Sequence, residues 1–490
     1  MIQAAEPDVP ITEAEPADEN PTIPAGYTYL GQFLDHDITF DPVSSLTRLN
    51  DPNALEDFRT PRLDLDSVYG RGNSDQPYLY ERHDVIDAPN GNNMKLLLGD
   101  ERQPPSVAPV SRPDLPRNSQ DLALIGDPRN DENTIVSQLQ SLFLRFHNKM
   151  LSVVPNTFEE SGDFFAEVQR QVRQYYQWIV IHDFLPRIVG QHTLDKIFPN
   201  GQHRPKLAFY RPKNNAFMPV EFSVAAYRYG HSMIRPSYSL SSDVPQGSDA
   251  AHNRVPIFSA NTDPKANLRG FRRIPDPWGI DWRFFFPDLG APPQQNPQTN
   301  NPYLTDPSKP FLTPQPSYRI DALLVDPLAH LPGDPVLVGA SHTPTTSLAE
   351  RNLQRGRALG LPSGQAVAHH LGAATLTDEE IWSNADDPTL DTTRRQLLAD
   401  FPQFAGNAPL WFYVLREAER TKRTGFENDI RGGHHLGEVG GRIVAEVLIG
   451  LIWNDHQSYL YQDPEWRPQP PIARAAGVFE MSDLIRFTDS

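Results

Sequence analysis

The stretch Gly31-Gln32-Phe33-Leu34-Asp35-His36-Asp37-Ile38-Thr39-Phe40 carries the most informative side-chain pattern of the chain. If Ala25–Phe40 is a helix, Gln32, Asp35 and His36 are spaced i, i+3 and i+4 and share one face. Asp37 lies about 100° further round the helix and points elsewhere. The pattern therefore predicts a reacting face made of an amide, a carboxylate and an imidazole, with a second carboxylate behind it that can bind a cation.

The composition narrows the function classes. The chain has 490 residues, a net charge of −18, 49 prolines against 30 glycines, and no cysteine. The negative charge argues against nucleic acid as a partner, because no basic face is available to replace phosphate counterions. Without cysteine, disulfides and thiolate metal sites are excluded, so any metal must bind to histidine, carboxylate, carbonyl or a cofactor. The prolines predict extended, stiff connections.

The ends and the apolar runs give expectations about location. Met1–Asn20 is acidic and lacks a basic segment followed by an apolar one, so no signal peptide is predicted. The longest apolar run, Ile443–Trp453, is too short to span a bilayer. We expect a protein without a membrane span that is cytoplasmic, or exported by a route that needs no signal peptide. The sequence does not indicate an oligomeric state.

The periodicity of apolar residues predicts a mainly α protein with little β-structure. Residues 1–24 are expected to form an extended or disordered arm, and residues 25–490 a single large domain with long proline-rich loops. One helix is expected to begin at Gly126-Asp127-Pro128-Arg129 and to run to Met150. Another is expected over Ser161–Asp183, ended by Pro186. Further helices are expected at 219–234, 347–359, 378–385, 391–400, 408–424 and 437–453. The segment Pro275–Pro316 has no periodicity and is predicted to lie on the surface.

Three further clusters carry chemistry. On the helix expected at 126–150, Arg129, Glu132 and Asn133 are again spaced i, i+3 and i+4. Arg228 and His231 are one turn apart, and the glycine between them lets a flat ligand approach the backbone. The loop Thr60–Asp66 has oxygen-bearing residues at alternate positions, which together with Asp37 could surround a hard cation such as Ca²⁺.

Each cluster has a simpler explanation when taken alone. Arg129 and Glu132 can form an ordinary helical ion pair, and the acidic loop residues can be solvated turn residues. The run Asp35-His36-Asp37 also fits a hydrolytic metal centre, because His-Asp pairs bind divalent ions. That alternative lacks the further histidines at H-x-x-x-H or H-E-x-x-H spacing that such a centre needs.

The order and the residues of six sequence blocks resemble those of the animal-type haem peroxidases, the peroxidase–cyclooxygenase superfamily. The blocks are Gly31–Thr39, Asp66–Gly70 (DSVYG), Gly126–Glu132 (GDPRNDE), Arg145–Asn148 (RFHN), Arg228–Ser232 (RYGHS) and Asn352–Arg357 (NLQRGR). They occur in the family's order and cover about residues 24–455. Any single block could arise by chance, whereas six in register make a specific match. The absence of cysteine sets this chain apart from the secreted animal members and makes it look like a microbial relative.

The resemblance implies roles for the residues around a haem b. His36 is similar to the distal histidine, Arg129 to the distal arginine, and Gln32 to the distal glutamine of the family. His231 matches the proximal iron ligand, and Asn352 the asparagine that hydrogen-bonds its other ring nitrogen. The same resemblance implies covalent and metal contacts as well. Asp35 and Glu132 lie where the family makes ester bonds to haem, Arg228 lies at the cofactor, and the calcium ligands correspond to Asp37, Thr60, Arg62 (through its carbonyl), Asp64 and Asp66.

The function implied by the resemblance is a haem peroxidase that reduces H₂O₂ and oxidises small phenols or (pseudo)halides. The alternative is a haem-dependent fatty-acid dioxygenase or cyclooxygenase-like oxygenase. Those relatives carry a tyrosine three residues before the proximal histidine, where this chain has Arg228, although Tyr227 and Tyr229 flank it. A third class, a haem-binding protein without turnover, predicts a damaged distal site and conflicts with the presence of both His36 and Arg129.

Overall fold

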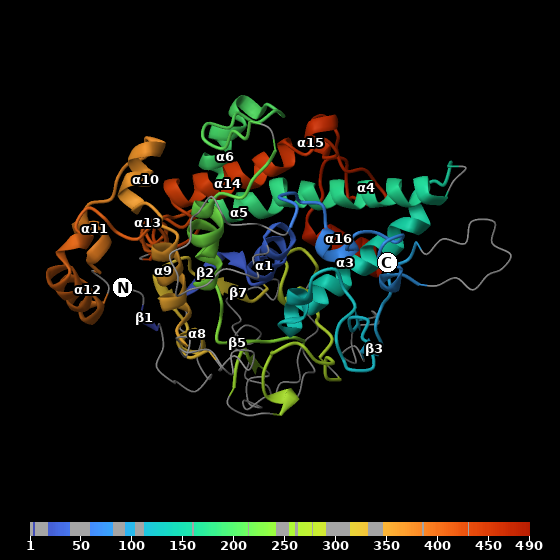
Figure 1. The fold of residues 1–490 in the computed structure, drawn as a ribbon, viewed down its shortest axis with the longest axis horizontal. Coiled ribbons are helices and arrows are strands. Elements are labelled where there is room, and N and C mark those ends of the chain that lie inside the picture. Colours follow the sequence, from blue (N-terminus) through green and yellow to red (C-terminus); the bar gives the residue numbers. More distant parts are fainter. Residues whose placement is uncertain are drawn as a thin grey trace.

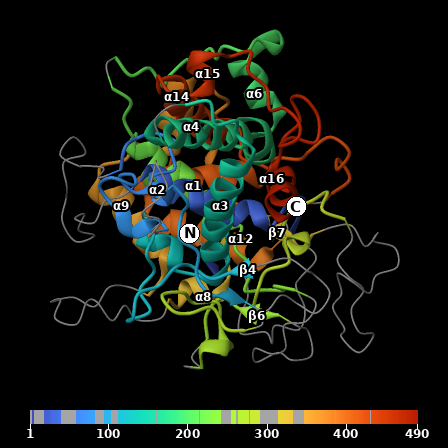
Figure 2. The ribbon, with the colours of Figure 1, turned by 90° about the vertical axis from the view of Figure 1, so that its right-hand side faces the viewer.

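The computed structural model describes residues 3–4, 18–39, 59–81, 94–102, 112–158, 161–213, 215–241, 254–259, 263–276, 278–290, 314–331, 346–384, 387–429 and 431–490. Helices dominate the part of the chain that it describes, and strands are few and short. This architecture confirms the mainly α fold class. Helix α1 lies near the centre of the molecule in two perpendicular views (Figure 1, Figure 2). Among the described residues, every helix is too short or too polar to cross a membrane.

Helix α1 spans Gly26–Ile38 and is buried on almost every side, with only Gln32 and Asp35 partly exposed. Phe33 stacks on Phe143 with ring centroids 4.7 Å apart and meets the edge of Tyr176 at 6.3 Å. These contacts fix α1 against the two long helices α3 (Thr134–Val153) and α4 (Ser161–Ile179). A helix surrounded by protein in this way is held by packing rather than by its own propensity. Its partly exposed residues therefore mark an internal cavity.

The region 126–150 differs from the prediction. A short 3₁₀ turn covers Pro128–Asp131, capped by the Asp127 carboxylate, and α3 begins separately and spans Thr134–Val153. Asn133 has extended backbone angles (φ −147°, ψ 156°), and its side chain accepts the N–H groups of the first turn of α3. The predicted single helix is wrong because two N-caps in succession begin two separate elements. Arg129, Glu132 and Asn133 therefore do not share a helical face.

The long helix after it also departs from expectation at its end. Helix α4 spans Ser161–Ile179, continues as a π-helical turn over Val180–Phe184, and leads directly into α5, Leu185–Val189. Pro186 lies in the first turn of α5, directly after the π-helical turn, and does not end the helix. The helical course ends at Gly190, whose φ is +73°.

The segment 219–234 forms no regular α-helix. It consists of a π-helical turn over Glu221–Ala225 followed by a 3₁₀ turn over Ala226–His231. The break lies at Ala225 (φ −129°, ψ −74°), which lies outside helical backbone angles. The apolar spacing predicted the position of this helical segment correctly, but it did not predict the π and 3₁₀ turns. Such π-turns are rare and often accompany functional sites.

Five of the other helices in the described part of the chain lie at positions predicted from the sequence, and six were not predicted. Helices α9, α11, α12, α13 and α14 correspond to predicted ones and span Leu348–Ala358, Asp378–Trp382, Pro388–Asp400, Leu410–Ala418 and Glu438–Trp453. Helices α2, α6, α8, α10, α15 and α16 were not predicted and span Asp66–Tyr69, Gln191–Ile197, Asp326–Ala329, Gly364–Leu371, Tyr459–Gln462 and Met481–Asp489. Figure 1 shows α16 and the C-terminus beside α3, where Arg145 of α3 forms an ion pair with Asp489 at 2.8 Å.

Four two-stranded sheets complete the described part. Strand β1 (Gln3–Ala4) pairs in parallel with β8 (Leu323–Leu324), and β2 (Glu19–Pro24) pairs antiparallel with β7 (Pro316–Tyr318). Two antiparallel pairs follow, β3 (Glu101–Arg102) with β4 (Arg112–Pro113), and β5 (Ser237–Tyr238) with β6 (Val255–Pro256). The described parts of the N-terminal arm, β1 and β2, are thus extended and paired with the body of the protein.

The segment expected to be a surface excursion is partly core. Trp278 is fully buried, and Trp282 and Phe286 are 2% and 1% exposed. Phe286 packs edge-on against Tyr27 at the start of α1, with ring centroids 5.3 Å apart. The backbone comes so close there that a Cβ on Gly26 would lie 2.5 Å from the carbonyl oxygen of Phe285. Large aromatic side chains outweigh the lack of periodicity at this point; residues 291–313 lie outside the described part.

Candidate active site

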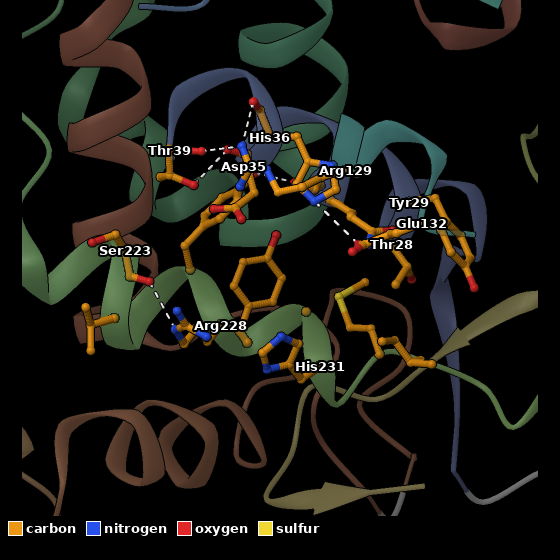
Figure 3. Close-up of a pocket in the computed structure, with 18 of the residues that line it drawn as sticks. Thr28, Tyr29, Asp35, His36, Thr39, Arg129, Glu132, Ser223, Arg228 and His231 are labelled. Atoms are coloured by element: carbon orange, nitrogen blue, oxygen red, sulfur yellow. Dashed lines mark hydrogen bonds and ion pairs between the residues drawn. The ribbon is translucent and has the colours of Figure 1, made fainter. Parts of the chain in front are cut away.

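A cavity of about 430 Å³ lies between α1 and the segment 218–234, within the ~300–1,000 Å³ typical of ligand pockets. Of the predicted site residues, seven line this cavity: Gln32, Asp35, His36, Arg129, Glu132, Arg228 and His231. Figure 3 shows His36 and Arg129 on one wall and Arg228 and His231 on the opposite wall. The two histidines, far apart in sequence, therefore lie on opposite walls of one cavity.

The ring of His36 is oriented by a buried chain of amides. Its Nδ1 lies 2.8 Å from the carboxamide oxygen of Asn130, whose Nδ2 donates to Gln140 Oε1 at 2.8 Å. Gln140 in turn donates its Nε2 to the carbonyl of Ser67 at 3.3 Å. Because each amide already donates to the next group, the oxygen of Asn130 faces His36 and must accept a proton from Nδ1. A His36 ring with its proton on Nδ1 would have its lone pair on Nε2.

Three side chains beside His36 form a second polar group. Gln32 donates to the carboxylate of Glu132 and accepts a hydrogen bond from Asn133 Nδ2 at 3.0 Å. Glu132 Oε1 lies 3.5 Å from His36 Nε2. Burial raises the pKa of Glu132 above its usual value, against the lowering effect of His36 and Arg129. The contacts of Gln32 thus hold its amide at the cavity wall.

Substitution of Asn133 tests its role as the N-cap of α3. Asn133→Ala removes the N-cap of α3 and is expected to lower the free energy of unfolding by about 1 kcal/mol. Asn133→Ser keeps a capping oxygen, so it should recover most of that stability while it still lacks the amide that holds Gln32. Denaturant unfolding of the three proteins measures the effect. Equal stability of wild type and Asn133→Ala would contradict the capping role.

The guanidinium of Arg129 is held by its backbone surroundings and by one carboxylate. Its Nη2 donates to the carbonyls of His36 (3.1 Å) and Thr39, and to Asp127 Oδ2 at 2.8 Å. Asp127 also forms an ion pair with Arg59, which reaches Asp66 at 3.1 Å. Burial raises the pKa of Asp127, but the hydrogen bonds and charges of the two arginines outweigh it and lower that pKa overall. Asp66, Arg59, Asp127 and Arg129 therefore form, in this order, a continuous row of ion pairs.

On the opposite wall, His231 is linked to Asn352 and Arg228. Asn352 Nδ2 lies 2.9 Å from His231 Nδ1, and Asn352 Oδ1 accepts from Arg228 Nη1 at 2.9 Å. Burial, with a smaller contribution from the charge of Arg228, lowers the pKa of His231 to about 3. His231 is therefore neutral at physiological pH, the form in which imidazole binds a metal. Asn352 does not line the cavity and acts on it through His231.

The predicted calcium residues gather on the far side of α1. Asp37, Asp64 and Asp66 each offer a carboxylate oxygen within 4.8 Å of the others. Asp37 is fully buried and accepts hydrogen bonds from Leu65 N and Tyr176 Oη, both at 3.1 Å. Burial, with a smaller contribution from the charge of Asp64, outweighs Arg59 and raises the pKa of Asp66 to about 7. Carboxylates crowded in this way are a site that a hard cation would neutralise.

The other predicted ligands lie in the same loop. Thr60 Oγ1 donates to Asp64 Oδ2 at 3.1 Å, and the N–H of Arg62 donates to the carbonyl of Thr60 at 2.7 Å. Residues that contact the site without having been predicted include Arg59, Asp127, Asn130 and Gln140. Asp127 and Asn130 belong to a block already recognised, whereas nothing in the local pattern marks Arg59 or Gln140, because their partners are distant in sequence.

Comparison with known proteins gives a family match for part of the chain. Residues 44–274 match the model of the family described as animal haem peroxidase. This part of the chain therefore resembles an animal haem peroxidase domain. The matched residues include Arg129 and His231, while α1 and Asn352 lie outside the match. Thyroid peroxidase of Sus scrofa is 25% identical over 317 residues, which is 64% of this chain and 29% of that protein. Peroxidasin of Drosophila melanogaster is 25% identical over 34% of this chain and 11% of its own length. The chain thus aligns with less than a third of either relative.

Two solved structures share the fold of this chain. Peroxidase A from Dictyostelium discoideum aligns with a TM-score of 0.55 and 15% identity, covering 100% of this chain and 87% of that one. Fatty acid alpha-dioxygenase from Oryza sativa aligns equally well, with a TM-score of 0.55, 14% identity, and coverage of 100% and 74%. The shared fold therefore includes proteins of two different activities, and the choice between them depends on the side chains of the site.

Proposed function

We propose that this protein is a haem peroxidase that reduces H₂O₂ and oxidises small electron donors such as phenols or (pseudo)halides. The observation that carries the proposal is the placement of His36 with Arg129 on one wall of the cavity and His231 on the other. A planar macrocycle between two such walls would have one imidazole on each face. The two histidines would then do different work, one binding iron and the other moving protons.

The residues of the cavity suit a haem b. Arg228 and Arg355 both line it, and Arg228 is partly buried. Desolvation, helped by the charge of Arg355, lowers the pKa of Arg228 and outweighs the opposing charge of Asp35. Two guanidinium groups at one wall favour an anionic ligand, and the propionates of haem supply that charge. Space beside Gly230 is open, since a Cβ there would meet no atom within 4 Å. Asp35 and Glu132 line the same cavity, which is the position needed for the proposed ester bonds.

When bound, the haem iron supplies the redox chemistry that cleaves the peroxide O–O bond. The chain's own residues handle the proton and the charge. His36 Nε2, which carries the lone pair, accepts a proton from one peroxide oxygen and returns it to the departing oxygen. Arg129 provides positive charge at the same wall, where negative charge develops as the bond breaks. Gln32, held by Glu132 and Asn133, offers a polar contact beside them.

Binding of iron by His231 requires a change in the hydrogen bond between His231 and Asn352. An imidazole that binds a metal through Nε2 carries its proton on Nδ1 and needs an acceptor there. Asn352 presents its Nδ2 to His231 Nδ1, because its oxygen accepts from Arg228. A half-turn of the carboxamide would present the oxygen to His231 instead. We propose that Arg228 leaves Asn352 for a propionate when haem binds, which frees the amide to turn.

The test uses the purified, haem-loaded protein. Addition of H₂O₂ should shift the Soret absorption, and guaiacol should then be oxidised with turnover. Acid–butanone extraction reports whether the pigment stays with the polypeptide and so whether ester bonds form. The proposal would be wrong if the protein bound haem but showed neither a spectral change with peroxide nor oxidation of guaiacol, iodide or thiocyanate.

A fatty-acid dioxygenase is the second candidate, because the dioxygenase fold aligns as well as the peroxidase fold. Tyr227 and Tyr229 line the cavity, and the Tyr227 hydroxyl donates to the carbonyl of Gly31 at 3.2 Å. Arg228 in place of a tyrosine three residues before His231 favours the peroxidase. Oxygen uptake with a polyunsaturated fatty acid, lost in Tyr227→Phe or Tyr229→Phe, would reverse this ranking.

We also propose Ca²⁺ as a second cofactor, bound by Asp37, Asp64 and Asp66 with Thr60 and the carbonyl of Arg62. Support comes from the three convergent carboxylates in the part of the chain that the structure describes. Asp37 adjoins His36, so a cation at this position would fix the helix that carries the proton-moving residue. No membrane and no nucleic acid is proposed as a partner.

Removal of the cation should destabilise the protein. At a hundredfold excess of Ca²⁺ over its Kd, the free energy of unfolding is expected to rise by about 2.7 kcal/mol relative to EDTA-treated protein. Asp37→Asn should abolish this increase, since it removes the buried carboxylate of the cluster. Asp75→Asn, at an exposed position (52%) of a nearby loop, is the matched control and should keep it. A calcium effect of the same size in Asp37→Asn would argue against this site.

A further inference from the structure

The His36 ring stands between two groups that favour opposite tautomers. Asn130 lies 2.8 Å from Nδ1 and favours a proton on Nδ1, whereas Glu132 lies 3.5 Å from Nε2 and favours a proton there. Only the Nδ1–H tautomer leaves Nε2 able to accept a proton from a ligand in the cavity. The outcome of this competition therefore decides whether His36 can act as a base.

Distance, burial and hydrogen bonding all favour Asn130. Asn130 is fully buried, whereas the Glu132 side chain is 37% exposed and its Oε1 already accepts a hydrogen bond from Gln32. A separation of 2.8 Å is a normal hydrogen bond, while 3.5 Å is at the limit of one. A buried amide oxygen without a hydrogen-bond donor is unfavourable, so the ring of His36 is not expected to release Asn130 in favour of Glu132.

The orientation of Asn130 is itself fixed by groups outside the cavity. Its Nδ2 donates to Gln140 in α3, and Gln140 donates to the carbonyl of Ser67, with all three residues fully buried. Turning the Asn130 amide over would place its oxygen opposite the oxygen of Gln140, unless Gln140 also turned. Gln140 is prevented from turning, because its oxygen would then face the carbonyl of Ser67 and two acceptors would meet without a proton between them.

We propose that Asn130, backed by Gln140, is the positioning residue that holds His36 in its Nδ1–H tautomer. This inference rests on the proposed function for its catalytic meaning, because proton acceptance by Nε2 is the step it prepares. Asn130 does not line the cavity and acts only through the ring of His36. The chain Ser67–Gln140–Asn130–His36 thus sets which ring nitrogen is free.

Two substitutions separate this role from simple packing. Asn130→Leu removes the acceptor at similar size and should let Nε2 carry the proton beside Glu132. Asn130→Asp keeps an acceptor for Nδ1 but loses the donor to Gln140, so it disturbs packing and polarity at least as much. Gln138→Leu is the matched control. Gln138 is a buried amide on α3, the helix that carries Gln140, but its hydrogen bonds go to the backbone of Trp278 and Ile280.

The first measurement is ¹⁵N NMR of histidine-labelled protein, loaded with haem in its diamagnetic ferrous–CO form. In wild type, Gln138→Leu and Asn130→Asp, Nδ1 of His36 should appear as protonated and Nε2 as unprotonated. Asn130→Leu should reverse or mix these signals. Unchanged tautomer signals in Asn130→Leu, or signals in Asn130→Asp like those of the leucine variant, would overturn the inference. If the chain bound no haem, the same spectra of the protein as isolated would still decide it.

The second measurement is the rate of reaction of the ferric haem protein with H₂O₂. Asn130→Leu should lose about 100-fold, the low end of the contribution of a positioned acid–base group. Asn130→Asp should stay within about tenfold of wild type, and Gln138→Leu should match it. Loss of rate in Asn130→Asp equal to that in Asn130→Leu would indicate a structural role only. An absence of reaction in wild type would instead overturn the proposed function and leave the NMR result standing.

Discussion

Replacement of His36 by alanine is expected to slow the reaction of the haem-loaded protein with H₂O₂ by about 10²–10⁴-fold, the usual range for a positioned acid–base residue. With its proton on Nδ1, which lies 2.8 Å from Asn130, the ring of His36 would have its lone pair on Nε2. Without that lone pair, the peroxide proton has no neutral base at this wall. Stopped-flow absorption in the Soret region, at several peroxide concentrations, gives the rate constant directly.

Haem retention must be shown in the same preparation. The pyridine haemochrome content of His36→Ala should equal that of wild type, since His36 is not the proposed iron ligand. His330→Ala is a suitable control, because this histidine has a 71% exposed side chain, pairs with Asp326 at 3.2 Å and does not line the cavity. A rate in His36→Ala within a few-fold of wild type would remove His36 from the mechanism.

Replacement of His231 by alanine is expected to weaken haem binding by more than about 100-fold, because loss of an outer partner of a metal ligand already costs 10–100-fold. The low pKa of His231, about 3, keeps its imidazole neutral and available to iron. Competition with apomyoglobin, which captures released haem, measures the change. Added imidazole should restore the absorption spectrum in part, because the substitution leaves a space of matching shape.

The histidine controls distinguish ligand loss from unfolding. His330→Ala should keep wild-type haem affinity, and the thermal unfolding of haem-free His231→Ala should resemble that of haem-free wild type. Asn352→Ala removes the partner of His231 Nδ1 together with the acceptor of Arg228, and it should retain haem with a smaller loss of affinity. Unchanged haem affinity in His231→Ala would show that iron is bound elsewhere and would undo the assignment of the two walls.

Sequence periodicity identified the helix that carries the site. Gln32, Asp35 and His36 all line the cavity, and Asp37 lies with Asp64 and Asp66 on the other side. This placement could be expected because side chains three and four residues apart share a face in any α-helix. The same reasoning failed for Arg129, Glu132 and Asn133, since Asn133 leaves the helical conformation to cap α3. Arg129 and Glu132 nevertheless reach the cavity from a 3₁₀ turn and the residue that follows it.

The pattern at 219–234 shows a second limit. Apolar spacing marked a helix there, but the chain alternates between π and 3₁₀ turns, with a break at Ala225. Such turns depend on which neighbours the segment packs against, and those neighbours are helices far away in the sequence. The wrongly predicted surface segment around Trp278 and Trp282 has the same cause, because burial of its aromatic rings depends on α1 and not on local periodicity.

The sequence by itself determined the helical class, the face of α1 and the residue types that chemistry at the cavity needs, because these follow from local spacing and from side-chain chemistry. Only the tertiary structure decided that His36 and His231 lie on opposite walls of one cavity, that Asn130 and Gln140 form a hydrogen-bonded chain to His36, and that Arg59 joins Asp66 to Asp127. Each of those contacts joins residues that are separated in the chain. Their approach is set by how the whole core packs, which no local pattern contains.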